Sequence, residues 1–160
     1  MTNRVKVICE NTSEALEIPI GTSLLELQEQ TCIKRPYPLL AAYVDNRLKE
    51  LNYKIFKPIT VRFIDITHFE GYRVYQRTIS FILQKAVRDL YGDRQFHIRH
   101  SLGRGFYCEF ADGDEISDND IACLRECVQQ IIDARHPINR HRMRTEEVQA
   151  IYEEFDYHDK

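Results

Sequence analysis

The sequence predicts an α+β fold in which two small units follow one another. Three observations lead to this class: alternating apolar residues around one capped helix in the first 66 residues, a long amphipathic helical stripe after them, and a strand, turn and strand behind that stripe. A chain of 160 residues, 43% of them hydrophobic, can build one ordinary core or two small ones. We expect one unit at 1–66 and the other at 67–160, joined by a short segment.

The first unit has two strands, a helix and further strands. Apolar alternation from Asn3 to Cys9 and a second extended run to Pro19 predict a hairpin. The Ser-x-x-Glu spacing of 23–26 is that of a capping box at the start of a helix. The pair Asp45-Asn46 predicts a turn, and Val61 to Ile66 alternates as a closing strand. This order is a β-grasp pattern, in which one helix covers a curled mixed sheet.

The residues at 18–25 and 41–48 carry a more specific resemblance. They read Ile-Pro-Ile-Gly-Thr-Ser-Leu-Leu and Ala-Ala-Tyr-Val-Asp-Asn-Arg-Leu. With the strands around them, they resemble the TGS domain, a ubiquitin-like module found at the front of threonyl-tRNA synthetases and in some GTPases.

The second unit begins with a helix whose apolar residues recur three and four apart. The predicted buried stripe consists of Ile79, Ile82, Leu83, Ala86, Val87 and Leu90. Behind it, the pattern predicts a hairpin that turns at Gly103-Arg104-Gly105. We expect Phe96 and Ile98 on one strand, and Phe106, Cys108 and Phe110 on the other, to face inward.

Two more helices complete the second unit. Ser117 is expected to cap the first of them, with a buried stripe of Ile121, Leu124, Val128, Ile131 and Ile132. Thr145 is expected to cap a final helix that runs through Phe155.

The stretch from Gly71 to Phe110 resembles the start of the editing domain, or second additional domain, of threonyl-tRNA synthetases. The resemblance rests on the order of helix, strand and Gly-Arg-Gly turn, and on the string Gly-Phe-Tyr-Cys-Glu-Phe at 105–110. In that family the helix carries two histidines four residues apart, and here those positions are Arg77 and Phe81. Arginine is not a base near neutral pH and phenylalanine has no proton to transfer, so the resemblance implies that this pair does not edit. The family's Cys-x-x-x-His element lies later than the end of this chain.

Basic residues gather on the predicted hairpin and in the segment after the third helix. The net charge of −3 gives no global attraction to nucleic acid, so RNA contact needs such a local patch. Guanidinium groups beside Tyr72, Tyr75 and Tyr107 can hold phosphate and stack bases, although solvated surface arginines are the simpler interpretation. The candidate anion- or RNA-binding residues are Arg77, Arg99, Arg104, Arg140, Arg142 and Arg144.

We expect no metal and no cofactor in this chain. His97 and His100 are three apart in a strand and should point to opposite faces, and Cys123 and Cys127 form at most half a zinc site, so core packing is the simpler interpretation of those thiols. Gly103-Arg104-Gly105 lacks the spacing of a phosphate-binding loop, and no Walker motif occurs.

Together, the two units resemble the N-terminal region of bacterial uridine-kinase-like nucleoside kinases. That resemblance implies a non-catalytic accessory region of an ATP-dependent enzyme, with a downstream kinase domain as partner and RNA or a nucleotide as ligand. One alternative is the N-terminal tRNA-binding part of a threonyl-tRNA synthetase, and another is a scaffold for protein contacts. No apolar run approaches the roughly 20 residues that cross a bilayer. The N-terminus leads into strand-like sequence without a signal peptide, so the expected location is the cytoplasm.

Overall fold

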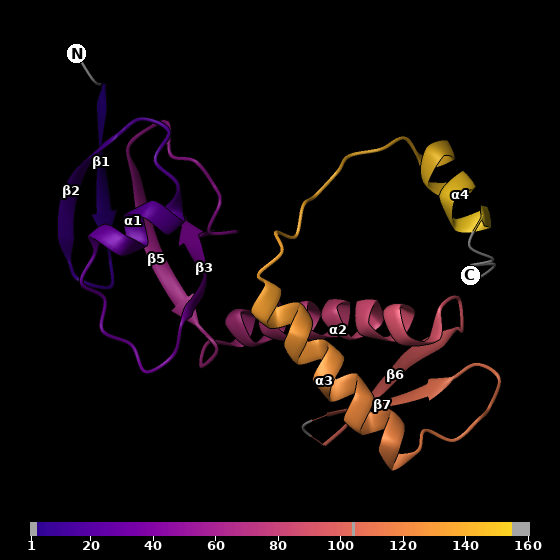
Figure 1. The fold of residues 1–160 in the computed structure, drawn as a ribbon. Coiled ribbons are helices and arrows are strands. Elements are labelled where there is room, and N and C mark those ends of the chain that lie inside the picture. The colour runs from indigo at the N-terminus through magenta and orange to yellow at the C-terminus, as the bar shows by residue number, and fades with distance from the viewer. Residues whose placement is uncertain (1–2, 104, 155–160) are drawn as a thin grey trace. The chain divides into compact units, whose positions relative to one another are not determined.

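The computed structural model describes residues 3–103 and 105–154, and its fold is α+β, as predicted (Figure 1). The chain divides between Ile79 and Ser80 into two compact units. Helix α2 (Phe69–Tyr91) continues from the first unit into the second. The boundary near residue 66 stays a prediction, and each unit is described by itself.

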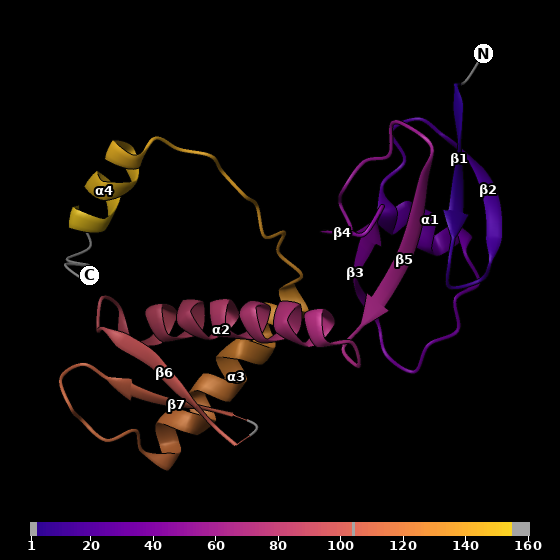
Figure 2. The same ribbon diagram turned by 180° about the vertical axis from the view of Figure 1, so that it is seen from behind.

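The first unit is a β-grasp domain with a five-stranded mixed sheet. The strands lie in the order β2-β1-β5-β3-β4, and β1 pairs with β5 in parallel while the other neighbours are antiparallel. Their bounds are β1 Arg4–Cys9, β2 Glu14–Pro19, β3 Leu39–Val44, β4 Arg47–Lys49 and β5 Ile59–Asp65. Helix α1 (Leu24–Gln30) lies across one face of this sheet (Figures 1 and 2).

Local sequence explains both the strand pattern and the helix start. Val5, Val7 and Cys9 are buried while the residues between them are exposed, which is the alternation that a half-buried strand requires. At the start of α1, the hydroxyl of Ser23 accepts the Glu26 N–H at 3.2 Å and the Glu26 carboxylate accepts the Ser23 N–H at 2.7 Å. This capping box satisfies two backbone donors that the helix leaves open.

The second unit packs α2 against the hairpin of β6 (Phe96–Leu102) and β7 (Gly105–Phe110) and against α3 (Asp118–Ala134). Its buried core consists of Ala86, Val87, Phe96, Phe110 and Leu124. The predicted capping of α3 is confirmed, because the Ser117 hydroxyl accepts the Asp120 N–H at 3.2 Å. Arg104 lies outside the described residues.

Four residues predicted to face inward are exposed instead. Leu90 is 43% exposed because Tyr91 fills that end of the core and meets Phe110 edge to face. Phe106 is 42% exposed although it alternates with Cys108 and Phe110, because it lies at the turn end of β7 whereas the core packs around Phe110. Ile121 and Ile132 are exposed because the face of α3 that packs inward is formed by Leu124, Cys127, Val128 and Ile131.

Helix boundaries differ from the prediction in two places. Helix α2 begins at Phe69, well before Ile79, the first residue of the predicted buried stripe. Helix α4 (Thr145–Glu154) includes Thr145 as its first residue, so the capping position falls on Arg144, whose carbonyl accepts the Val148 N–H at 3.1 Å. Phe155 lies outside the described residues.

Candidate nucleic-acid interface

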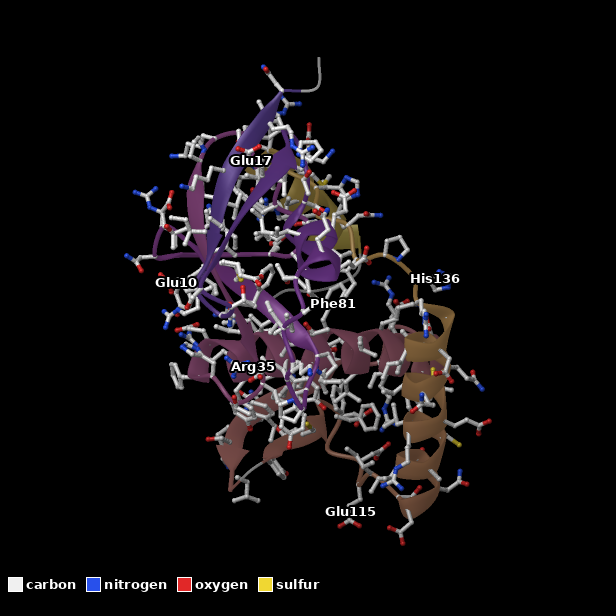
Figure 3. All side chains as sticks on the ribbon, turned by 90° about the vertical axis from the view of Figure 1, so that its left-hand side faces the viewer. Glu10, Glu17, Arg35, Phe81, Glu115 and His136 are labelled. Atoms are coloured by element: carbon white, nitrogen blue, oxygen red, sulfur yellow. The ribbon has the colours of Figure 1, made fainter. Side chains whose placement is uncertain are left out.

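The pair Arg77 and Phe81 lies one turn apart on α2, and both side chains are exposed. Phe81 is 60% exposed and is labelled in Figure 3. Among the described residues, Arg77 has no hydrogen bond or ion pair. The positions that carry histidines in the editing family therefore present a guanidinium group and a phenyl ring to solvent, and neither can act as a base.

This pair continues an exposed ridge of α2 that sequence reasoning missed. The ridge consists of Phe69, Arg73, Arg77 and Phe81, each four residues from the next. Phe69 is 69% exposed, and the guanidinium of Arg73 lies 5.6 Å from the centre of its ring. Arg73 also contacts the carboxylate of Glu70 at 3.2 Å. The four-residue spacing of these side chains was visible in the sequence. Phe69 and Arg73 belong to the ridge, however, only because α2 begins at Phe69, earlier than the predicted stripe.

On the hairpin, a register shift brings polar side chains onto the outward face. His97 is paired with Glu109 across the strands, and Tyr107 shares the face of Glu109 because it is two residues away. The ring of His100 stacks on Tyr107 with centroids 5.6 Å apart. The prediction that His97 and His100 point to opposite faces is therefore wrong, because the bulge adds a residue between them.

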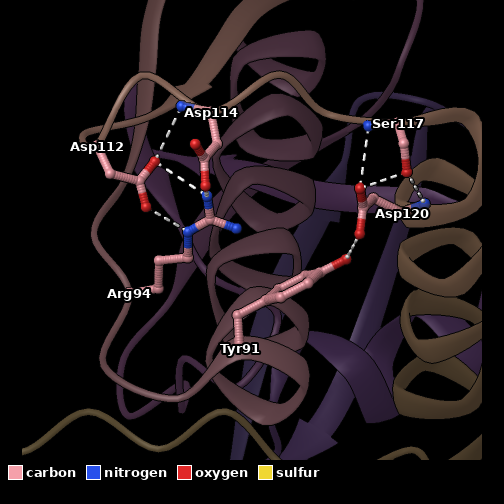
Figure 4. A network of polar contacts seen from close by, with 6 residues as sticks. All are labelled: Tyr91, Arg94, Asp112, Asp114, Ser117 and Asp120. Atoms are coloured by element: carbon pink, nitrogen blue, oxygen red, sulfur yellow. Dashed lines mark hydrogen bonds and ion pairs between the residues drawn. The ribbon is translucent and has the colours of Figure 1, made fainter.

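Two arginines on or beside the hairpin, Arg99 and Arg94, are already paired with acids. The Arg99 Nε donates to Glu109 at 2.7 Å, and this contact, with a hydrogen bond from Tyr107, lowers the pKa of the Glu109 carboxyl. The same carboxylate raises the pKa of Tyr107. Arg94 contacts Asp112 at 2.5 Å and Asp114 at 2.6 Å (Figure 4). The outward face of the hairpin is consequently less positive than its arginine count suggests.

The contacts of Arg94 belong to a polar network that fixes the connection from β7 to α3 (Figure 4). Its guanidinium lies 3.9 Å from the ring centre of Phe110. Nearby, the Tyr91 hydroxyl donates to Asp120 at 2.8 Å, and Asp120 also accepts hydrogen bonds from Ser117. Burial and this carboxylate raise the pKa of Tyr91 to about 12. These groups stabilise the fold and are not available to a ligand.

The remaining candidate arginines lie after α3. Arg140 and Arg142 are in the irregular segment 135–144, and both are exposed. Arg144 contacts Glu147 at 2.8 Å with 81% of its side chain exposed. Whether this segment and the hairpin form one RNA-binding surface stays a prediction.

The described part of the chain offers little to a metal ion or a nucleophilic mechanism. Within it, no group of three or more His, Cys, Asp or Glu side chains is placed to hold a metal. All five cysteines are unpaired thiols, and burial raises the pKa of Cys108. A raised pKa keeps that thiol protonated, which is the less reactive form. No described helix is both long and apolar enough to cross a membrane.

Comparison with known proteins found similarity over most of this chain, although no family model matches it. It is 26% identical over 138 residues to the threonine–tRNA ligase of Syntrophomonas wolfei, covering 86% of this chain and 22% of the relative. The threonine–tRNA ligase of Thermotoga neapolitana is 26% identical over 157 residues, covering 96% of this chain and 24% of the relative. The enzyme of Clostridium kluyveri is 27% identical over 132 residues, covering 80% and 21%.

These relatives correct one expectation from the sequence. The chain spans less than a quarter of their length. They are named as ligases that act on threonine and tRNA, and not as kinases. The predicted downstream kinase domain is therefore wrong as a partner, and the resemblance to uridine-kinase-like proteins has no support among these relatives.

Proposed function

We propose that this chain is a tRNA-binding accessory region of a protein of the threonyl-tRNA synthetase type. We also propose that the chain does not carry out editing, the hydrolysis of mischarged tRNA. The observation that carries the proposal is the exposed pair Arg77 and Phe81, which replaces the histidines of the editing domain that the chain resembles. Similarity to threonine–tRNA ligases supports the tRNA part of it. The chemistry of the replacing side chains supports the loss of editing.

The ridge of α2 has the composition of a surface that binds nucleic acid without catalysing a reaction. Phe69 and Phe81 are twelve residue steps apart, which is about 18 Å along a helix. Guanidinium groups bind phosphate, and exposed aromatic rings stack on bases of any sequence. Arg77 is the guanidinium on this ridge that has no acidic partner among the described residues. The overall charge of −3 should keep the binding weak.

The other candidate arginines are expected to contribute unequally. Arg99 and Arg144 would have to leave Glu109 and Glu147 before they could bind phosphate. Arg142 has no hydrogen bond or ion pair among the described residues. Arg142 should therefore contribute more to RNA binding than Arg99 or Arg144.

A titration of labelled tRNA at two salt concentrations tests the proposal. The variant Arg73→Gln, Arg77→Gln should weaken binding. The decrease of log K, where K is the association constant, with log salt should also become less steep by about 1 to 2, because up to two phosphate contacts are lost. The variant Arg140→Ala, Arg142→Ala should also weaken binding. Lys34→Gln, Arg125→Gln removes two exposed positive charges elsewhere and serves as the control. Equal affinity for wild type, both test variants and the control would contradict the proposal.

Two further features belong to the same proposal. The expected place of action is the cytoplasm. The expected organisation is a TGS-like unit at 1–66 followed by a partial editing-type unit at 67–160. Limited proteolysis that releases a stable fragment ending near residue 66 would support this boundary, and cleavage only near residue 79 would contradict it.

A further inference from the structure

A hollow on the first unit lies on the face of the sheet away from the buried core. It is lined by Glu10, Tyr43, Asp45, Asn46, Thr60 and Arg62. Tyr43 and Arg62 are directly opposite each other on β3 and β5. Arg62 is exposed between the buried residues Val61 and Phe63, which fixes the side of the sheet to which it belongs. Glu10, one of the lining residues, is labelled in Figure 3.

Arg62 stacks on Tyr43 at one side of the hollow, and among the described residues its guanidinium contacts no second ring. The guanidinium of Arg62 lies 4.9 Å from the ring centre of Tyr43, and its Nε is 3.6 Å from the Glu10 carboxylate. The Arg62 side chain remains 47% exposed. A guanidinium plane that is covered on one side by an aromatic ring can stack on a second planar group with its other side. A nucleobase is such a group.

Two residues further along the same strands, the hollow is lined by a carboxylate and an amide that the backbone holds in place. Asp45 and Asn46 occupy the tight β3–β4 turn with φ of 47° and 63°. The Asp45 N–H donates to the Thr60 carbonyl, and its Oδ1 accepts the Thr60 N–H, each at 3.0 Å. Its second carboxylate oxygen and the Asn46 amide make no hydrogen bond within the described part of the chain.

These groups match one nucleobase better than the others. Guanine presents N1–H and N2–H donors on one edge and the acceptors O6 and N7 beside them. A carboxylate accepts from the donors, and an amide donates to the acceptors. Adenine would place an unprotonated N1 toward the carboxylate. Glu10 and Asp45 outnumber Arg62, so the hollow disfavours phosphate but accepts an uncharged base. Arg47, the next exposed residue after Asn46, can contact a phosphate outside it.

We propose that this hollow binds a guanine base, stacked on Arg62 and recognised by Asp45 and Asn46. The base could belong to a free nucleotide or to an unpaired position in RNA. Residues of the α2 ridge take no part, so the inference stands or falls separately from the proposed function.

Titration of the whole chain with GMP and with AMP, followed by backbone amide NMR shifts, tests the preference. We expect GMP to bind at least about tenfold tighter than AMP, since a bidentate pair discriminates bases by roughly that much, and to shift Thr60 and Asn46. The variant Asp45→Asn keeps its size and its acceptor for Thr60, so it should fold and yet lose the preference. Glu14→Gln removes an exposed carboxylate from β2 and is the control.

Other outcomes would overturn the inference. Equal affinity for GMP and AMP would do so, as would an unchanged preference in Asp45→Asn with an unchanged melting temperature. A uridine oligonucleotide with one central guanosine, compared with GMP, then identifies the source. Tighter binding of the oligonucleotide indicates RNA, equal binding indicates a nucleotide site, and no binding of either contradicts the site.

Discussion

At the scale of single residues, Gly71 shows how closely the chain packs where β5 leads into α2. The carbonyl of Asp65 accepts the His68 N–H at 3.1 Å. A side chain at Gly71 would collide with this same backbone carbonyl, which has no flexible atoms to move away. Glycine at 71 is therefore required by space, and not by a left-handed backbone.

The variant Gly71→Ala should destabilise the chain by about 1 to 3 kcal/mol, as overpacking against fixed atoms does. Urea unfolding measures the change. Gly105→Ala is the matched control, because a Cβ there would meet only the Leu102 carbonyl at 3.9 Å. A loss for Gly71→Ala no larger than that of the control would show that the approach to Asp65 is not tight.

Leu83 and Leu90 both belong to the predicted buried stripe of α2, but only Leu83 packs in the observed core. Leu83 packs against the second core and is partly buried, whereas Leu90 is 43% exposed. Leu83→Ala should cost about 2 kcal/mol, the lower end for core leucines. Leu90→Ala should stay within about half a kcal/mol. Equal losses of stability in the two variants would mean that Leu90 belongs to the buried core, and would contradict the structure.

At the scale of elements, acidic groups hold the connection between β7 and α3. Hydrogen bonds from Ser117 and Tyr91 lower the pKa of Asp120, and Arg94 lowers the pKa of Asp112. A folded-state pKa below the unfolded value stabilises the fold above the unfolded pKa of about 3.9, and this stability disappears as pH falls through the folded value.

The melting temperature should therefore fall between pH 5 and pH 2 more steeply in wild type than in Asp112→Asn, Asp120→Asn. Asp93→Asn, an exposed aspartate near the same end of α2, is the control. At the alkaline side the sign is opposite, because the pKa of Tyr91 is raised to about 12. Stability should decrease from pH 10 to 12 in wild type and decrease less in Tyr91→Phe, where the smaller contribution of Tyr107, whose pKa is also raised, remains. Parallel curves for wild type and variants would contradict these assignments.

Elements with a strong local signal were predictable from the sequence. The alternation of β1 and the capping residues Ser23 and Ser117 are local, and the structure contains all three. The bulge in β6 was not predictable from local sequence. The register of β6 against β7 depends on pairing between the two strands and on how Phe96 packs in the core. His100 was therefore assigned to the wrong face. In the candidate interface, Arg77 and Phe81 were found by resemblance, but the acids that neutralise Arg94 and Arg99 come from distant sequence positions.

At the scale of the whole molecule, we expect this chain to bind tRNA without catalysing a reaction. We expect neither deacylation of seryl-tRNA above the buffer rate nor ATP turnover by purified protein, because the described residues include neither the histidine pair nor a Walker loop. Both assays are direct. Deacylation that a substitution in this chain abolishes would contradict the loss of editing.

Whether this chain binds tRNA is decided by equilibrium binding of labelled tRNA to the wild-type chain at low and at high salt. We expect measurable binding at low salt that weakens as salt rises, because phosphate contacts release counterions. The variant Arg73→Gln, Arg77→Gln should weaken the low-salt affinity by about tenfold, or roughly 1.4 kcal/mol. No detectable binding at low salt, or an affinity that salt and the variant both leave unchanged, would contradict the proposed binding of tRNA.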